Sequence, residues 1–127
     1  MKTNGEVEAL ERLIGQLSGL HAEISQLAKK SPNDALNAFK LRLVNKVIAA
    51  GNAVLPKGYR PFKDFEQFDS DDMPTNSDVT MILTQYMEQS ERYRSDNVMY
   101  ENYKWVYKVN GRASDIIAAQ PTKIGEK

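Results

Sequence analysis

The sequence predicts a mainly α, α+β fold: an antiparallel helical hairpin and a third helix, with a C-terminal β-hairpin. Three observations predict it. Apolar residues recur at helical spacing through most of the 127 residues, good capping residues precede the apolar stripes, and Asn110-Gly111 separates two strand-like segments. We expect a single domain over residues 1–120 and a flexible tail over 121–127.

The first periodic segment predicts a helix over about residues 6–29. Six apolar residues, separated alternately by three and four positions, form the a/d seam of a heptad pattern: Leu10, Leu13, Leu17, Leu20, Ile24 and Leu27. We call this set the leucine seam. Acidic residues near the helix start and lysines near its end suit the helix macrodipole. The seam needs a partner, which is either another helix of this chain or a second copy in a dimer.

A second helix is predicted over about residues 32–54. Ser31 is suited to the N-cap and Pro32 to the first helical position, and an apolar stripe continues to Val54. Pro56 ends the pattern. Because the link to the first helix is short, the two helices should form an antiparallel hairpin.

Residues 55–76 predict an ordered loop. Three prolines interrupt it, yet four aromatic rings recur at every third position and should pin it to the helices: Tyr59, Phe62, Phe65 and Phe68. Long ordered loops in small domains are often functional. A third helix is predicted over about 77–94, capped by Asn76 or Ser77, with a short helical continuation at 97–101.

Residues 103–117 fit two templates. Aromatic and β-branched residues alternate as in a hairpin around Asn110-Gly111. The hairpin would place two pairs of residues opposite each other: Trp105 and Ile116, and Val109 and Arg112. The same segment also fits a helix, which gives an all-α four-helix bundle as the alternative fold. The aromatic content favours the hairpin.

The residue types present exclude most catalytic chemistry. The chain has no cysteine and one histidine, His21, so thiol nucleophiles, Cys–His pairs and multi-histidine metal sites are excluded. No glycine-rich phosphate loop occurs. The acidic loop fails the calcium-loop pattern, because Pro74 stands at its glycine and Thr80 at its bidentate glutamate. We expect a protein that is not an enzyme and holds no cofactor or metal.

The chain also lacks the features of a membrane or secreted protein. No apolar run approaches the roughly 18 residues that a membrane span needs. The N-terminal sequence is acidic and amphipathic, which does not resemble a secretory signal. We therefore expect a cytoplasmic protein that does not contact a membrane.

The distribution of charge is the most informative feature. Seventeen basic and seventeen acidic residues give a formal net charge of zero. However, residues 29–63 hold eight Lys or Arg and one acid, whereas residues 64–91 hold eight acids and no Lys or Arg. These blocks either neutralise each other across the fold, form complementary surfaces of an oligomer or partner complex, or let the basic block contact nucleic acid.

We expect a non-catalytic interaction or regulatory module that acts through protein–protein contacts, with a homodimer through the leucine seam as one form. Tyr, Trp and Arg dominate protein–protein hot spots. The predicted recognition surface lies in the aromatic and acidic loop, at Tyr59, Arg60, Phe62, Phe65, Phe68, Asp69, Asp71 and Asp72.

The alternative is a winged-helix-like nucleic-acid-binding protein, with the hairpin as its wing. Its phosphate contacts would come from the basic segment 29–63 and from the hairpin near 104–112: Lys40, Arg42, Lys46, Lys108 and Arg112. Against it, no helix-turn-helix pair with a short turn is found, and the predicted helix at 77–94 is acidic for most of its length.

Overall fold

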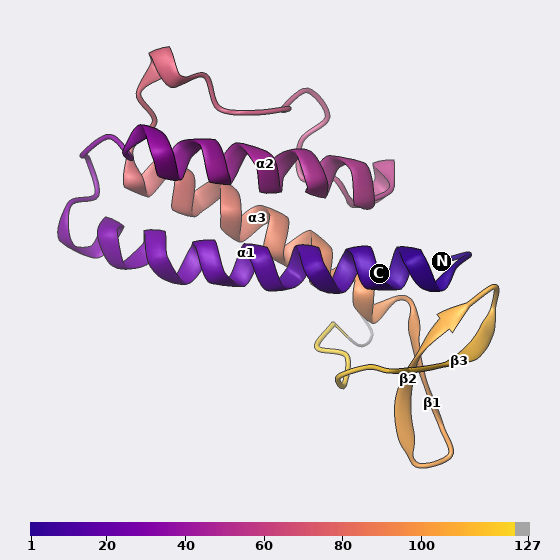
Figure 1. Cartoon of the computed structure of the whole chain (residues 1–127). Helices are drawn as coiled ribbons and strands as arrows, with labels where there is room; N and C mark the ends of the chain where they lie inside the picture. Colours follow the sequence, from indigo (N-terminus) through magenta and orange to yellow (C-terminus); the bar gives the residue numbers. More distant parts are fainter. Residues whose placement is uncertain (124–127) are drawn as a thin grey trace.

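The computed structural model describes residues 1–123 and has the mainly helical α+β fold that the sequence predicts. Three helices lie side by side in one body, and a small antiparallel sheet projects from one end of it (Figure 1). The described elements are α1 (Asn4–Lys30), α2 (Ala38–Val54), the 3-10 turns η1 (Lys57–Tyr59) and η2 (Ser70–Asp72), α3 (Asn76–Ser95), β1 (Val98–Glu101), β2 (Lys104–Val109) and β3 (Arg112–Ile117).

The leucine seam lies inside this body. Four of its members are buried, namely Leu10, Leu13, Leu17 and Ile24. The other two, Leu20 and Leu27, are half-buried. They form one core with apolar residues of α2 and α3 such as Ile48 and Leu83. The partner of the seam is therefore the chain itself. This corrects the expectation of a dimer through the seam, because a second copy could reach these side chains only by displacing the core.

The link between α1 and α2 is longer than predicted. Ser31 ends α1, donating its N–H to the carbonyl of Leu27 at 2.8 Å, and does not cap the next helix. Asn37 caps α2 instead, with its side chain accepting from the N–H of Lys40 at 2.8 Å. Pro32 is thus outside the helix.

A long-range backbone pairing explains this difference. The N–H of Leu36 donates to the carbonyl of Pro74 at 3.0 Å, and the N–H of Asn76 donates to the carbonyl of Asp34 at 2.9 Å. Ala35 and Thr75 form an isolated antiparallel bridge between these contacts. Residues 32–37 stay out of the helix because their backbone groups are bonded to the chain that leads into α3.

Threonine caps place the other helix starts slightly earlier than predicted. Thr3 accepts from the N–H of Glu6 at 3.1 Å, so α1 begins at Asn4. Thr75 and Asp78 form a reciprocal capping box at the start of α3. Each cap satisfies backbone N–H groups that the first turn of a helix leaves without a partner.

The predicted helical continuation at 97–101 is wrong, because these residues form β1. The sheet is an antiparallel meander in the order β1-β2-β3. Asn102 and Tyr103 join the first two strands, both with positive φ (52° and 64°), which suits a two-residue hairpin turn. A left-handed conformation is rare for a bulky residue such as Tyr103, so the sequence gives little sign of this turn.

The second hairpin is confirmed, which excludes the four-helix alternative. Val109 pairs with Arg112 as predicted, across a turn in which Asn110 and Gly111 have positive φ. The predicted pairing further along is wrong, because an irregularity between Val106 and Lys108 shifts the register. Trp105 accepts from the N–H of Ala118 at 3.0 Å and does not face Ile116.

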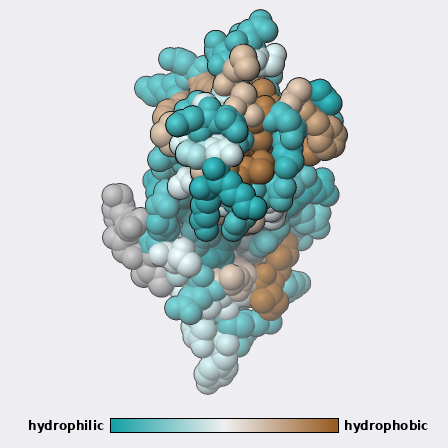
Figure 2. All heavy atoms as spheres, turned by 90° about the vertical axis from the view of Figure 1, so that its left-hand side faces the viewer, coloured by the Kyte–Doolittle hydropathy of each residue, from teal (hydrophilic) through white to brown (hydrophobic). Residues whose placement is uncertain are grey.

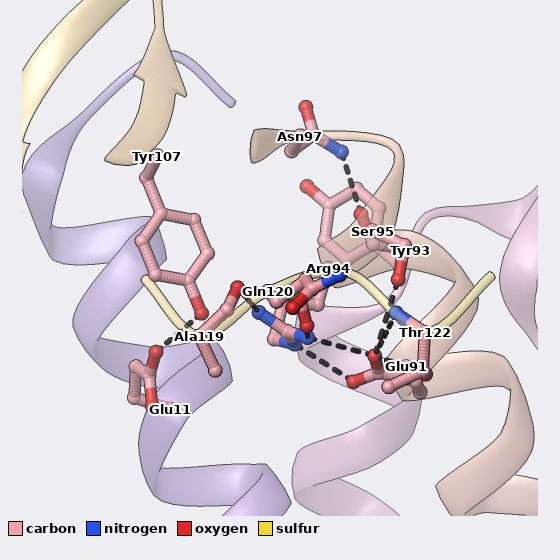
Figure 3. A network of polar contacts seen from close by, with 10 residues as sticks. All are labelled: Glu11, Glu91, Tyr93, Arg94, Ser95, Asn97, Tyr107, Ala119, Gln120 and Thr122. Atoms are coloured by element: carbon pink, nitrogen blue, oxygen red, sulfur yellow. Dashed lines mark hydrogen bonds and ion pairs between the residues drawn. The ribbon is translucent and has the colours of Figure 1, made fainter. Parts of the chain in front are cut away.

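A polar network ties the last described residues to α3 (Figure 3). Arg94 is buried and donates to both carboxylate oxygens of Glu91 at 2.7 Å. It also donates to the carbonyls of Ala119 at 2.8 Å and Gln120 at 3.0 Å. Thr122 donates its hydroxyl to Glu91 at 2.6 Å. Residues 121–123 were expected in a flexible tail, but they are held by these bonds, by the burial of Pro121 and by the ion pair between Lys123 and Glu88. Residues 124–127 of the expected tail lie outside the described residues.

The network shifts the pKa of Glu91. Burial alone would raise this pKa, but hydrogen bonds from Arg94 and Thr122 outweigh the burial and lower it from 4.5 to about 2. Nearby, the hydroxyl of Tyr107 donates to Glu11 on α1 and joins the sheet to the helices. Burial, followed by this hydrogen bond to a carboxylate, raises the pKa of Tyr107 well above its usual value.

We expect the substitution Glu91→Gln to lower the free energy of unfolding by about 2–3 kcal/mol, since it leaves the buried Arg94 without a counter-charge. Urea unfolding at neutral pH measures this change. The matched control is Glu88→Gln, one turn earlier, whose exposed ion pair with Lys123 should contribute less than about 1 kcal/mol. Equal effects of the two substitutions would contradict a structural role for the Glu91 network.

Glu91 also makes the stability depend on pH. Its pKa is lower in the folded chain than its usual value of 4.5, so its contribution is complete above that value and is lost as the pH falls toward about 2. Thermal unfolding across this window should show a steeper loss of stability for the native chain than for Glu91→Gln. Parallel curves would show that another group controls the acid response.

Candidate protein-interaction groove

Two asparagines of α2 hold the aromatic and acidic loop against the helix. Asn45 donates to the carbonyl of Phe68 at 3.0 Å and accepts from the N–H of the same residue at 2.9 Å. Asn52 donates to the carbonyl of Phe65 at 3.1 Å. The two asparagines are seven residues apart, so they lie two turns apart on one side of α2. The loop consequently runs along α2 as far as η2 (Figure 1).

Asn52 is itself held from α3. The hydroxyl of Tyr86 donates to its side-chain oxygen at 2.7 Å. Tyr86 is fully buried, and burial raises the pKa of its hydroxyl. Its ring lies so close to Gly51 that an added Cβ there would be 2.9 Å from the ring atom Cδ1. The position of the loop therefore depends on how closely α2 and α3 approach each other.

Three phenylalanine rings form an edge-to-face series along the loop. The centroids of Phe62 and Phe65 are 6.3 Å apart, and those of Phe65 and Phe68 are 5.1 Å apart. Phe65 and Phe68 pack against the core, whereas Phe62 remains 40% exposed. The loop is thus fixed by its inward rings as well as by the asparagine side chains.

A groove of about 750 Å³ separates α2 from the loop. Its residues are Ala38, Leu41, Arg42 and Asn45 of α2 and the continuous segment 64–70. A neighbouring hollow is lined by residues 61–65, which include Phe62, and by Ile82 of α3. Figure 2 views the end of the body where α2 begins and η2 lies, and shows hydrophobic atoms framed by hydrophilic ones.

The groove is acidic. Asp64, Glu66 and Asp69 line it together with one cation, Arg42, and all four are exposed. Asp71 and Asp72 extend the acidic surface onto η2. Within residues 1–123 the ion pairs are Lys40–Glu23, Arg94–Glu91 and Lys123–Glu88. None of them joins the basic block to the acidic block, so the groove carboxylates face solvent without a basic side chain bonded to them in the described part of the chain.

The predicted interaction residues fall into three groups. Phe65, Phe68 and Asp69 line the groove. Phe62 lines the neighbouring hollow, and Asp71 and Asp72 lie on η2. Tyr59 and Arg60 lie at the start of the loop and do not line the groove.

Tyr59 and Arg60 attach the loop to the helices. The ring of Tyr59 lies 4.8 Å from that of Tyr93, with the guanidinium of Arg92 at 4.3 Å from its centroid. Its hydroxyl donates to Asp96 at 2.7 Å, and burial and this bond raise its pKa. Arg60 donates to the carbonyl of Leu55 at 3.2 Å.

The predicted nucleic-acid residues are not brought together. Lys40, Arg42 and Lys46 lie in the first half of α2. Lys108 lies on β2 and Arg112 on β3. These parts are at opposite ends of the molecule (Figure 1). In addition, Lys40 is engaged by Glu23 at 2.9 Å.

The residues that build the groove were not predicted from the sequence. Asn45 and Asn52 were not singled out, although two asparagines seven positions apart inside a helix are a usable signal, because asparagine is a weak helix former. Asp64 and Glu66 were seen only as part of the acidic block. The buried Leu41 was not singled out either.

Comparison with known proteins gives no relative: no family model, no curated protein and no solved structure matches the chain. In the described part of the chain, no helix combines the length and the apolar character needed to cross a bilayer. Residues 1–123 also contain no group of three or more His, Asp or Glu placed to hold a metal ion.

We expect Asn45→Ala to release the loop around Phe68, because the substitution removes both hydrogen bonds of the amide. Amide hydrogen exchange over residues 64–70 should become faster, and the free energy of unfolding should fall by about 1–2 kcal/mol. Lys46→Ala, an exposed neighbour on the same helix, is the control and should change neither quantity. Unchanged exchange in the Asn45 variant would mean that the rings alone hold the loop.

Proposed function

We propose that the protein is a non-catalytic interaction module that acts in the cytoplasm and binds a partner protein in the groove between α2 and residues 64–70. One observation carries this proposal: a segment without regular secondary structure is held extended by Asn45 and Asn52, while its carboxylates stay exposed. A preformed wall loses little conformational freedom on binding, which favours affinity.

The chemistry of the groove favours a basic partner segment. Asp64, Glu66 and Asp69 outnumber the single cation Arg42, so the groove attracts Lys or Arg side chains. Phe65 and Phe68 are half-buried, and the exposed parts of their rings offer apolar contact beside the charges. A segment in which Arg alternates with apolar residues matches both features, since Arg also binds aromatic faces.

The same chemistry supports binding over catalysis and over contact with nucleic acid. The groove offers carboxylates, amides and one guanidinium. The single histidine, His21, lies between α1 and α3, where its Nε2 is 3.1 Å from the hydroxyl of Thr84. Phosphates would be repelled by the three carboxylates, so the winged-helix alternative draws no support from this surface.

The test uses a library of short labelled peptides in which Arg and Leu alternate, with Glu/Leu peptides of equal length as the reference. The triple variant Asp64→Asn, Glu66→Gln, Asp69→Asn should weaken Arg/Leu binding by about 10-fold or more, and added salt should weaken it further. The matched control removes three exposed acids elsewhere: Glu8→Gln, Glu101→Gln and Asp115→Asn.

Binding that is lost only in the groove variant supports the proposal. Equal losses in both triple variants would show that only the overall charge matters. No binding by any Arg/Leu peptide would overturn the assignment of the partner.

A further inference from the structure

Two rows of opposite charge lie on the exposed side of α2 and the loop. The basic row consists of Arg42 and Lys46, which are exposed and about one helical turn apart on α2. The acidic row consists of the groove carboxylates of Asp64, Glu66 and Asp69. None of the ion pairs within residues 1–123 involves either row. Both rows are therefore open to opposite charges on another molecule.

The basic row adjoins an exposed aromatic ring. Phe39 lies three positions before Arg42, on the same side of α2, and is 62% exposed. The guanidinium of Arg42 lies 5.8 Å from the centroid of this ring. This side of α2 thus combines one ring with two cations, which is the mixture of apolar and basic groups that the groove favours.

Contacts to the backbone fix the position of the loop along α2. They join Phe65 to Asn52, Phe68 to Asn45, and Pro74 to Leu36 just before the helix. Residue numbers rise along the loop while they fall along α2, so the loop runs antiparallel to the helix (Figure 1). Each charge on the loop can therefore be assigned to a level of α2.

The charges of the two rows lie at similar levels. One residue of extended chain spans about 3.3 Å, and one residue of helix spans about 1.5 Å. With the two asparagine contacts as reference points, Asp69 lies near the level of Arg42. On the same basis, Glu66 lies about one helical turn from the level of Lys46.

An exposed apolar side chain lies beyond each row, at the end of the body where α2 begins. Phe39 is the one on α2, and Met73, which is 66% exposed, is the one on the loop. Met73 precedes Pro74, whose carbonyl bonds to the N–H of Leu36. Figure 2 faces this end and shows hydrophobic atoms framed by hydrophilic ones. Apolar side chains grouped in this way mark surfaces of protein contact.

A second copy of the chain carries the opposite groups in matching places. Two-fold rotation about an axis that lies along this face, between the two rows, exchanges the rows and keeps every level. The rotation pairs groups of one copy with groups of the other: Arg42 with Asp69, Lys46 with Glu66, and Phe39 with Met73. Such an interface is isologous, so each of these contacts occurs twice.

We propose that the partner bound by the groove is a second copy of this chain, in a symmetric dimer that pairs the basic row of each copy with the acidic row of the other. This inference rests on the proposed function, because it assigns the occupant of the same groove. Opposite charges favour this pairing and set its orientation. The leucine seam stays inside each copy, so the dimer forms without displacing the core.

Sedimentation velocity of the full chain tests the dimer. The native chain should show a monomer–dimer equilibrium, and its dissociation constant should rise about 10-fold or more between about 50 and 500 mM NaCl, because salt screens exposed charges. An excess of the Arg/Leu peptides should dissociate the dimer, since they occupy the same groove.

Reversal of the charges tests the pairing of the rows. Arg42→Glu with Lys46→Glu makes the basic row acidic, and Glu66→Lys with Asp69→Lys makes the acidic row basic. Each double variant alone should be monomeric, because like charges then face each other. An equimolar mixture of the two should form mixed dimers, because both contacts are again between opposite charges. The control, Lys104→Glu with Arg112→Glu, changes the net charge equally on the exposed part of the sheet and should dimerise as the native chain does.

Four results would overturn the inference. A native chain that stays monomeric at low salt but binds Arg/Leu peptides would leave the proposed function standing with a different partner. Dimers that persist in either row variant, or in excess peptide, would use another surface. A mixture that stays monomeric would show that the rows do not face each other. Loss of the dimer in the sheet control as well would show that only net charge matters.

Discussion

The contact between Tyr86 and Gly51 is the constraint on which the rest of the structure depends. Only a residue without a side chain lets the ring lie against α2, because a Cβ would be 2.9 Å from the ring. From this position the tyrosine hydroxyl reaches Asn52, and Asn52 holds the backbone of Phe65. A packing contact in the core thus determines where an irregular loop lies on the surface.

Different side chains of the loop face the core and the solvent. Phe65 and Phe68 point to the core and supply the apolar burial, while Asp64, Glu66 and Asp69 stay exposed. Because the rings and the asparagines fix the backbone, the acids do not have to contribute to folding. They remain free of ion pairs with the basic block in the described residues, so their negative charge faces the solvent.

Local patterns predicted most of the fold, whereas long-range backbone bonds account for the errors. Apolar spacing identified all three helices, and Asn110-Gly111 identified the second hairpin. Pro32 suits a helix start, so it led to a wrong prediction. Its segment is instead bonded to Pro74, Asn76 and Ser77, which lie 38 to 45 positions away in sequence. The aromatic spacing of the loop was visible, and so was the pair of asparagines in the helix. The spacing does not show that Asn45 bonds to the backbone of Phe68, because that partner lies 23 positions away in sequence.

The order of the helices along the chain has a consequence for biosynthesis. α1 packs more extensively against α3 than against α2, although α2 follows it directly. At a translation rate of about 5–20 residues per second, α3 leaves the ribosome several seconds after α1. During that interval part of the leucine seam has no partner within the nascent chain, so the growing polypeptide presents an apolar helix face that is prone to aggregation.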